Sequence, residues 1–430
     1  MTSKSGRPPY CYVYITLPGA VQAVTAGRYE LTTDRQGTPT GQFLYGRSYA
    51  ERPNAVDIDP VELKLVRGRL YETAQNDGVF GSIRDASPDH WGRRVIQKAL
   101  RTVHLTEMDY LLQSADDRAG ALSFGLNEKP PAPKRQFNKT LQLKGLQTIA
   151  LAILKENKPL SGPEVQQIRK LLLDGSSLMG GARPKAVIED EDGLWIAKFN
   201  RPDDAWNMAR VEHALLTLAN SCGISVAESK LVSAGGRDIL LVKRFDREAT
   251  QEGYLRHRMV SALTLLRADE NIADRGKWSY PQLVEELRRV SANPRKDAEE
   301  LFKRMCFNAL VSNLDDHPRN HAVIAKSRGW RLSPAYDITP SRSISQDHRD
   351  LAMTVGAFGR YASAQNLLSQ CRRFLLEPEK AQDIISDMEG RVRTTWHRVA
   401  RKATVSIRDC RAIEGAFVYE GFSFALQPVD

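Results

Sequence analysis

The most informative segment of this chain is Ser312-Asn313-Leu314-Asp315-Asp316-His317-Pro318-Arg319-Asn320, which Pro334-Ala335-Tyr336-Asp337 follows after a short spacer. Asp315 and Asn320 have the D-x-x-x-x-N spacing of phosphoryl-transfer loops, in which the aspartate accepts the proton of an attacking hydroxyl and the asparagine binds magnesium. The spacer has the pattern of a hairpin that returns Asp337 beside Asn320. Each residue type also forms ordinary turns, but the joint spacing predicts a base, Asp315, beside two Mg²⁺ ligands, Asn320 and Asp337.

The composition is that of an ordinary globular protein of two or three domains, with 430 residues of which 41% are hydrophobic and 27% charged. The amino terminus has no apolar signal region and no run approaches the roughly 18 apolar residues that span a bilayer, so we expect a cytoplasmic protein without membrane contact. The five cysteines lack C-x-x-C pairing, which argues against zinc or a disulfide framework. The net charge of +10 is compatible with a nucleotide, nucleic acid or acidic partner, and also with a solvated basic surface.

The chain changes character along its length. Residues 10–70 alternate short β-rich runs with Gly- and Pro-bearing turns, which predicts a small antiparallel sheet. A Pro-rich, charged connection at 127–135 indicates a boundary, and the sequence beyond about 255 has mainly helical periodicity. We therefore expect three parts: a β-rich amino-terminal module at 1–126, an ATP-binding portion at 141–250, and a helical carboxy-terminal part at 251–430 that carries the catalytic and metal loops. The sequence of residues 81–94 indicates a packing corner between subdomains and suggests no chemical role of its own.

A small-residue loop precedes two predicted strands and has the sequence Ser176-Ser177-Leu178-Met179-Gly180-Gly181-Ala182-Arg183-Pro184-Lys185. Such a loop lets backbone N–H groups approach phosphates, and a lysine on a following strand can neutralise them. Lys198, on the second of the two strands, is the predicted phosphate lysine. Glu212 lies on the next predicted helix, where it either orients that lysine or faces solvent.

Three further segments complete the prediction. The run 239–247 is typical of a buried strand whose edge could offer backbone groups to adenine. The helical pattern at 296–311 predicts a core helix that positions the catalytic loop directly after it. A second long helix, 378–402, has a basic face that could contact DNA phosphates or be simply solvated; its members are Arg391, Arg393, Arg398, Arg401 and Lys402.

Taken together, these segments resemble the HipA family of bacterial toxin kinases, the Ser/Thr kinases of type II toxin–antitoxin pairs. The resemblance extends over nearly the whole chain, at 45–49, 85–94, 120–124, 180–185, 196–199, 242–247, 313–317, 320 and 336–337. It implies an α+β, two-lobed protein-kinase-like fold with a β-rich amino-terminal coupling module and a mainly helical carboxy-terminal lobe.

The resemblance also implies roles for individual residues and a need for ATP and Mg²⁺. Asp315 would be the catalytic base, Asn320 and Asp337 the metal ligands, and Lys198 a phosphate ligand. The adenine hinge would be Lys243, Arg244 and Phe245. The remaining ATP contacts would be Gly180, Gly181, Ala182, Arg183, Lys185, His317, Asn320 and Tyr336. Family members often autophosphorylate a serine of the glycine-rich loop, for which Ser176 and Ser177 are the candidates here.

The implied substrate is a protein, typically an aminoacyl-tRNA synthetase such as the glutamyl enzyme, whose phosphorylation stops translation and promotes dormancy. The implied partner is a HipB-like helix-turn-helix antitoxin, which neutralises the kinase and carries it to operator DNA. Two alternatives remain open from the residues. One is an inactive kinase-fold corepressor that acts with a DNA-binding antitoxin. The other is a small-molecule phosphotransferase or metal-dependent hydrolase built on Asp315-Asp316-His317.

Overall fold

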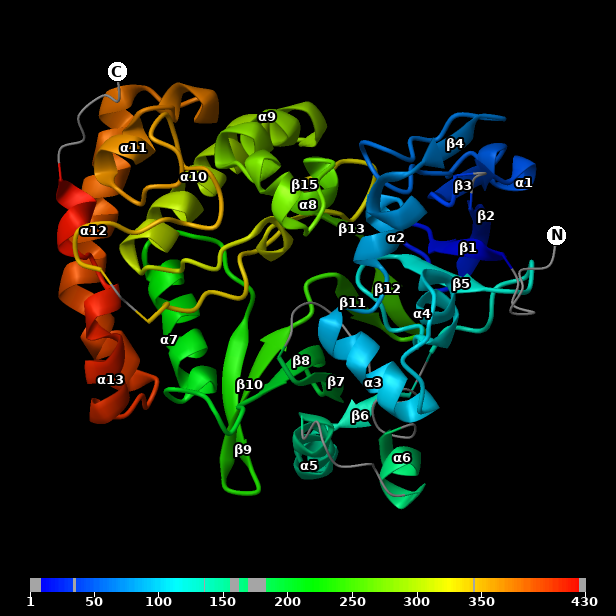
Figure 1. The fold of residues 1–430 in the computed structure, drawn as a ribbon, viewed down its shortest axis with the longest axis horizontal. Helices are drawn as coiled ribbons and strands as arrows, with labels where there is room; N and C mark the ends of the chain where they lie inside the picture. The colour runs from blue at the N-terminus through cyan, green and yellow to red at the C-terminus, as the bar shows by residue number, and fades with distance from the viewer. Residues whose placement is uncertain are drawn as a thin grey trace. The chain divides into compact units, whose positions relative to one another are not determined.

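The computed structural model describes residues 9–33, 36–134, 136–154, 162–168, 183–342 and 345–424 (Figure 1). The chain forms two compact units, each assembled from several segments. Unit 1 comprises residues 1–201, 241–260 and 324–328, and unit 2 comprises 202–240, 261–323 and 329–430. The chain passes from one unit to the other five times: after residues 201 and 328, and within the strands β10 (Arg237–Lys243), β13 (Arg258–Ser261) and β14 (Ala322–Ala325).

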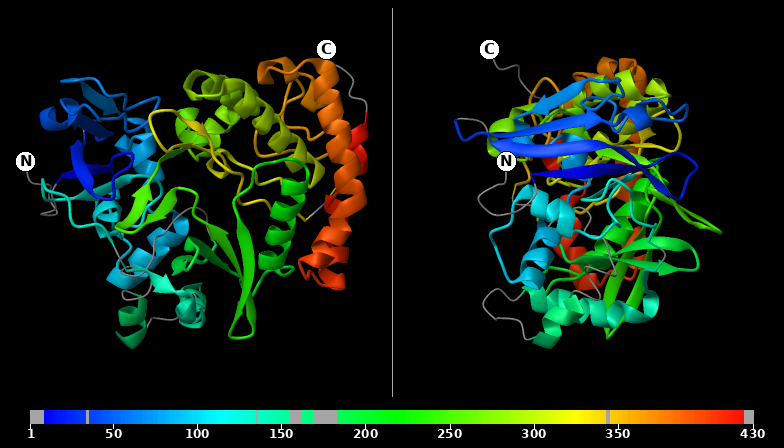
Figure 2. Two further views of the ribbon diagram at one scale, coloured as in Figure 1. Left: turned by 180° about the vertical axis from the view of Figure 1, so that it is seen from behind. Right: turned by 90° about the vertical axis from the view of Figure 1, so that its right-hand side faces the viewer.

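An antiparallel sheet of five strands begins unit 1 (Figure 2). Its strands are β1 (Tyr10–Thr16), β2 (Ala23–Thr33), β3 (Pro39–Tyr45), β4 (Leu70–Thr73) and β5 (Leu122–Gly125), in the order β4-β3-β2-β1-β5. Side chains alternate between the faces, so Cys11, Val13 and Ile15 are buried while Tyr10 and Tyr12 stay half-exposed. The buried face packs on one core with Tyr29 and Phe43. The β-rich amino-terminal region expected from the sequence is confirmed.

The segment between β3 and β5 contains the short helices α1 (Arg47–Ala50), α2 (Gly81–Asp85), α3 (His90–Leu100) and α4 (Glu107–Gln113), which Figure 1 labels. It also contains the 3-10 helix η1 (Gln75–Gly78). The Asp89 side chain caps α3 by accepting from the N–H of Gly92 at 2.7 Å, which is the usual role of Asp at this position. Glycine is required at Gly41, where a Cβ would lie 1.8 Å from the carbonyl oxygen of Gly78. Asp89 thus begins the helix of the segment in which the sequence predicts no chemistry.

A second sheet carries the predicted phosphate lysine. Its strands are β6 (Asn138–Lys139), β7 (Lys185–Asp190), β8 (Gly193–Phe199), β10 and β9 (Ser229–Ala234), in the order β6-β7-β8-β10-β9. Strands β7 and β8 form an antiparallel hairpin, and the turn uses Gly193 at a φ of 117°, which favours glycine. Strands β6, β7 and β8 belong to unit 1, β9 belongs to unit 2, and β10 crosses from one to the other. Unit 1 further contains α5 (Leu143–Leu154), α6 (Gly162–Ile168) and the hairpin of β11 (Arg247–Thr250) with β12 (Gly253–Arg256).

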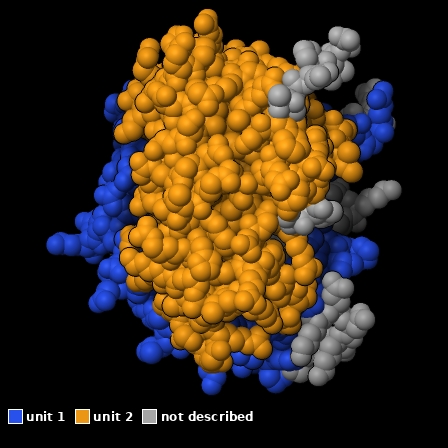
Figure 3. All heavy atoms as spheres, turned by 90° about the vertical axis from the view of Figure 1, so that its left-hand side faces the viewer, with its two compact units in different colours: residues 1–201, 241–260, 324–328 blue, residues 202–240, 261–323, 329–430 orange. Residues whose placement is uncertain are grey.

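Unit 2, whose atoms are orange in Figure 3, is mainly helical. Its longer helices are α7 (Met208–Ser221), α9 (Tyr280–Val290), α10 (Pro294–Leu310) and α12 (Pro378–Lys402), with shorter α8 (Ala262–Leu265), α11 (Ala364–Leu368) and α13 (Ile407–Ile413). Helix α10 buries its apolar residues Leu301, Phe302 and Met305 completely, and α12 lies alongside α7 and α10 (Figure 2). The predicted core helix before the catalytic loop is confirmed. None of the helices in the described parts of the chain has both the length and the apolar character that crossing a membrane requires.

Candidate active site

The catalytic loop follows directly from α10. Helix α10 ends when Ser312 adopts a left-handed conformation with a φ of 49°, and the short helix η5 (Pro318–Asn320) closes the loop. Asp315 is exposed at the loop tip, whereas Asn320 is only 7% exposed. The Asp315 carbonyl accepts from the N–H of His317 at 2.8 Å and from Nδ2 of Asn320 at 3.3 Å. The loop thus presents the carboxylate outward while its backbone is held by Asn320.

A buried polar network supports this loop from below. Asp316 is 3% exposed, and its Oδ2 accepts both the Tyr280 hydroxyl and Nε2 of His321, the latter at 2.8 Å. Asn308 of α10 donates Nδ2 to the Tyr280 oxygen at 3.1 Å, and Asn313 donates to Asn308 Oδ1 at 3.1 Å. Because buried polar groups are stabilising only when they are paired, this network defines one conformation of the loop.

The entry to the loop is held by a second set of contacts. Ser312 Oγ donates to the Ala416 carbonyl at 2.7 Å and accepts from Nη1 of Arg349 at 2.6 Å. Arg349 also donates Nη2 to the Gly415 carbonyl at 2.9 Å. The Ser341 N–H donates to the Ser312 carbonyl at 2.8 Å. The left-handed turn at Ser312 is therefore held by Ser341, Arg349 and the carbonyl of Ala416.

The spacer between the loop and Asp337 forms strands β14 and β15 (Arg331–Leu332), as the hairpin pattern predicts. Tyr336 donates its hydroxyl to the Arg319 carbonyl at 2.8 Å, which ties the end of the spacer to the catalytic loop. Asp337 has a φ of 59°, an uncommon conformation that is enriched at functional sites. The tertiary contacts thus return Asp337 to the region of Asn320.

The environment of Asp315 is electrostatically mixed. Although Asp315 is exposed, its carboxyl group is partly removed from water, which raises the pKa of Asp315. The carboxylates of Asp337 and Asp316 raise this pKa further, while His317 and Arg275 oppose the shift. Asp337 is therefore among the charged groups that act on the Asp315 carboxyl.

The donor set fits Mg²⁺. The Nδ2 group of Asn320 is bonded to the Asp315 carbonyl, so Oδ1 is the amide atom that could coordinate a cation. With the Asp337 carboxylate it supplies hard oxygen ligands, while water and phosphate oxygens would complete the octahedron that Mg²⁺ prefers. Across residues 183–342 and the other described segments, no three His, Cys, Asp or Glu side chains are grouped as a metal site.

The hairpin β7–β8 in unit 1 places the two lysines of the predicted phosphate site in register. Lys185 and Lys198 are directly paired across the strands, so their side chains project on the same face of the sheet. Lys198 is half-exposed, whereas Lys185 is 2% exposed and forms an ion pair with Asp89 at 2.9 Å. Lys185 is therefore placed to support the hairpin and not to face solvent.

Other predicted ATP contacts are placed less completely. Arg183 is half-exposed just before β7. The loop residues Ser176, Ser177, Gly180, Gly181 and Ala182 lie outside the described residues. His317 is half-buried in the catalytic loop of unit 2, with its ring 6.4 Å from that of Trp278.

The predicted adenine hinge, Lys243 to Phe245, ends strand β10. The Lys243 ammonium lies over the Trp195 ring at 5.5 Å. The Arg244 side chain is fully buried, and its backbone N–H donates to the Leu194 carbonyl at 2.9 Å. Among the hinge residues, Arg244 is therefore engaged within unit 1 through both its side chain and its N–H, so its contribution is support for the hinge.

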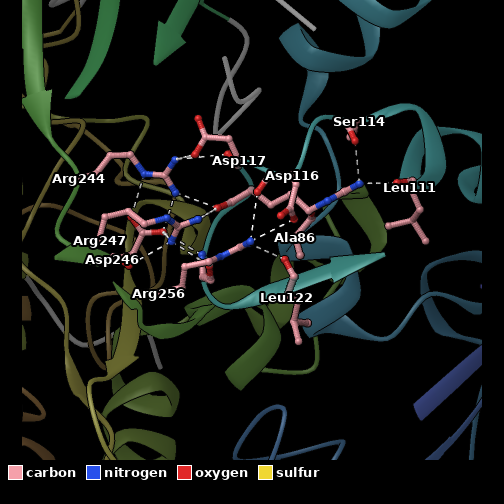
Figure 4. Close-up of polar contacts among 12 residues, drawn as sticks. Ala86, Leu111, Ser114, Asp116, Asp117, Leu122, Arg244, Asp246, Arg247 and Arg256 are labelled. Carbon is pink, nitrogen blue, oxygen red and sulfur yellow. Dashed lines mark hydrogen bonds and ion pairs between the residues drawn. The ribbon is translucent and has the colours of Figure 1, made fainter. Parts of the chain in front are cut away.

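Arg244 belongs to a buried ionic cluster that the sequence analysis did not anticipate (Figure 4). It contacts Asp117 and also donates Nη2 to Asp246 Oδ2 at 2.8 Å, and Arg247 donates to the same oxygen at 2.7 Å. Arg256 bonds Asp116 at 3.0 Å. Burial alone would raise the pKa of Asp246, but the guanidinium groups of Arg244 and Arg247 outweigh it and hold that pKa well below its usual range. The cluster joins residues 116–118 to the segment that follows the hinge.

Two further predictions can be placed. Glu212 is 3% exposed on α7 of unit 2, which is incompatible with a solvent-facing charge; its lysine-orienting role stays a prediction. On the basic face of α12, Arg391 and Arg393 pair with Asp387 and Glu389 one turn away, each at 2.8 Å. Part of that face is therefore neutralised by acidic residues of the same helix.

Comparison with known proteins assigns the family. The family model for the HipA-like C-terminal domain matches residues 177–396, and the model for the HipA N-terminal domain matches residues 21–125. Since the first match alone spans more than half of the chain, the chain belongs to the HipA family, and the resemblance seen in the sequence is confirmed.

Individual relatives agree with this assignment. The Sinorhizobium fredii protein named "Putative kinase Y4mE" is 26% identical over 346 residues, which cover 76% of this chain and 78% of that protein. A Haemophilus influenzae protein named "Putative kinase" is 27% identical over 226 residues, or 47% of this chain and 65% of that protein. The HipA chain of Shewanella oneidensis MR-1, solved with HipB and operator DNA, superposes with a TM-score of 0.68 over 94% of both chains at 16% identity. That likeness establishes the α+β HipA fold, as the sequence predicts.

Proposed function

We propose that this chain is a Ser/Thr protein kinase that transfers the γ-phosphoryl group of ATP to a hydroxyl of a protein substrate. The observation that supports the proposal is the loop at 312–320, in which the exposed Asp315 precedes the buried Asp316 network and its carbonyl is bonded by Asn320. The kinase names of two relatives support the same reaction class.

Each residue has a distinct task in this mechanism. Asp315 accepts the proton of the attacking hydroxyl, and its exposure allows a protein side chain to approach. Asn320 and Asp337 would hold Mg²⁺, which when bound neutralises charge on the phosphate oxygens. Lys198 of β8 would supply a positive charge for the phosphates. The raised pKa of Asp315 favours proton acceptance, because a stronger base takes a hydroxyl proton more readily.

We further propose the partners that the family suggests. The solved Shewanella relative is in complex with HipB and operator DNA, which supports a HipB-like antitoxin that neutralises this chain and carries it to an operator. An aminoacyl-tRNA synthetase, with the glutamyl enzyme favoured, is the proposed substrate, so that phosphorylation would inhibit translation and promote dormancy. Phosphorylation of Ser176 or Ser177 by the chain itself would add a second means of inhibition.

The test combines intact-mass spectrometry with nucleotide binding. Wild type, Asp315→Ala and Asp337→Ala are incubated with ATP, Mg²⁺ and purified glutamyl-tRNA synthetase, and the phosphate gained by each protein is mapped to peptides. We expect phosphate transfer by wild type alone, ATP binding retained by Asp315→Ala, and loss of the Mg²⁺-dependent part of ATP affinity in Asp337→Ala. Undiminished transfer by Asp315→Ala would refute the assignment of the base. A wild-type chain that binds the antitoxin but transfers no phosphate to any protein would favour the corepressor alternative.

A further inference from the structure

The segment from Pro88 to Gly92, for which the sequence suggests no chemistry, contacts the first residue of the phosphate-site hairpin twice. Asp89 Oδ2 accepts from the ammonium of Lys185 at 2.9 Å. The Trp91 indole N–H donates to the Lys185 carbonyl at 3.0 Å. The side chain and the backbone of Lys185 are therefore both held by the first turn of α3.

These contacts are completely enclosed. The side chains of Asp89 and Lys185 are 2% and 3% exposed, and Trp91 is not exposed at all. A buried ammonium group destabilises the folded state unless a carboxylate pairs with it. The Lys185 side chain is therefore held against the Asp89 carboxylate. The Asp89 carboxylate is itself fixed, because its Oδ1 accepts from the N–H of Gly92 at 2.7 Å at the start of an 11-residue helix.

The contacts of Asp89 and Trp91 with Lys185, called the anchor below, lie at the strand position that pairs with Lys198. Lys185 is paired with Lys198 across the hairpin, and the Phe199 N–H donates to the Pro184 carbonyl at 3.0 Å beside that pair. A shift at the start of β7 would therefore be transmitted through these backbone bonds to the strand position of Lys198. The anchor joins residues of the two regions that match separate HipA domain models, 21–125 and 177–396.

We propose that Asp89 is a positioning residue for ATP binding: by holding Lys185 at the start of β7, it sets the phosphate lysine Lys198 on β8. Asp89 touches no substrate in this scheme and acts only through Lys185. The inference rests on the proposed kinase function and extends it to a residue of the amino-terminal module. It predicts an effect on the KM for ATP and little effect on kcat, because the base Asp315 belongs to a different unit.

The test uses substitutions that separate anchoring from charge burial. Asp89→Asn keeps a good helix cap but removes the ion pair, and we expect it to raise the KM for ATP about tenfold, which matches the loss of one charged hydrogen bond. The double variant Asp89→Asn, Lys185→Met removes both buried charges, so thermal stability should recover relative to Asp89→Asn, whereas the KM should stay raised because the directional contact is still missing. Trp91→Phe removes the second contact and should raise the KM by a smaller factor.

Glu107→Gln is the matched control. It breaks the ion pair between Glu107 of α4 and Arg93 of α3, the helix that Asp89 caps, and it leaves Lys185 untouched. The KM of this variant for ATP should equal that of wild type. The inference is overturned if Asp89→Asn has the wild-type KM, or if the double variant regains the wild-type KM together with its stability. Should Asp89→Asn not fold, the KM of the double variant decides the question alone. A wild-type chain that neither binds ATP nor transfers phosphate would refute the kinase proposal itself, a result distinct from equal KM values in active proteins.

Discussion

The catalytic loop in unit 2 and the β7–β8 hairpin in unit 1 are built on the same plan but draw their support from different distances along the chain. In the loop, the exposed Asp315 is followed by the buried Asp316, whose partners Tyr280 and His321 lie within 36 residues. In the hairpin, the half-exposed Lys198 is paired with the buried Lys185, whose partner Asp89 is 96 residues away. The comparison shows that candidate residues of both sites can be recognised from the sequence, whereas a supporting contact from 96 residues away leaves no local signal.

The largest expected effect breaks the chemistry of the loop and leaves the hairpin intact. Asp315→Asn removes the proton acceptor while keeping the shape of the side chain, so the phosphoryl-transfer rate should fall by about 10³-fold, within the range of general-base catalysis. The affinity for ATP, measured by calorimetry with Mg²⁺, should change by less than about threefold. A comparable fall in ATP affinity would show that Asp315 binds the nucleotide and is not mainly a base.

The second effect breaks the distant ionic support of unit 1. Asp246→Asn leaves Arg244 and Arg247 buried without their shared carboxylate and should lower the free energy of unfolding by about 3 kcal/mol. Because the folded pKa of Asp246 is depressed, its stabilisation is present above the unfolded pKa of about 4 and is lost as pH falls below that value. Urea denaturation of wild type at pH 7 and pH 3.5 should therefore differ more than the same pair of measurements on Asp246→Asn.

A control from the same cluster sharpens this prediction. Asp116 pairs with Arg256 but its side chain is 30% exposed, so Asp116→Asn should cost less than about 1 kcal/mol. Equal losses of unfolding free energy for Asp116→Asn and Asp246→Asn would contradict the view that the effect of each substitution depends on how deeply its carboxylate is buried.

The third effect concerns the local support of the loop. Asp316→Asn keeps an acceptor for Tyr280 and His321 but removes the charge, so kcat should fall about tenfold through a less well-placed Asp315, with the KM for ATP unchanged. Tyr280→Phe removes one of the two donors and should have a smaller effect in the same direction. A raised KM with a normal kcat would reverse the comparison and link Asp316 to nucleotide binding.

The smallest effect concerns the carboxyl group of Glu62, which accepts a hydrogen bond from the backbone N–H of Gly81. Burial raises the pKa of Glu62 to about 7, helped by Asp59, although the Gly81 N–H opposes the shift. Since the folded pKa lies above the unfolded value of about 4.3, the folded state binds more protons between these values, so stability falls as pH rises from about 4.5 to 7. The half-buried side chain limits the change to less than about 2 kcal/mol. Glu62→Gln should abolish this pH dependence, and Glu30→Gln on β2 should preserve it.

The sequence was most informative where its residues act on their neighbours. The base, the metal ligands and the hairpin between them were predicted from the spacing of Asp315, Asn320 and Asp337, and the structure contains that hairpin and places Asp337 close enough to Asp315 to alter its pKa. Helix α10 was predicted from its apolar stripe, because helical periodicity is a local property. Asp316 was visible as the second aspartate of the loop, but its burial could not be inferred from an adjacent pair of identical side chains.

The contacts that place the phosphate lysine have no such local signal. Pro88-Asp89 before an amphipathic pattern is a helix start, and nothing in that pattern names Lys185 as the partner of the unused carboxylate oxygen. The same holds for Arg244, whose neighbours Lys243 and Phe245 suggested a hinge while its own side chain pairs with Asp117 across 127 residues. The order of residues determined which chemistry this chain could carry, since spacing within a loop sets which groups act together. The tertiary structure determined which charged side chains are buried in ion pairs that support the candidate sites, because burial and long-range ion pairing exist only once distant segments have packed.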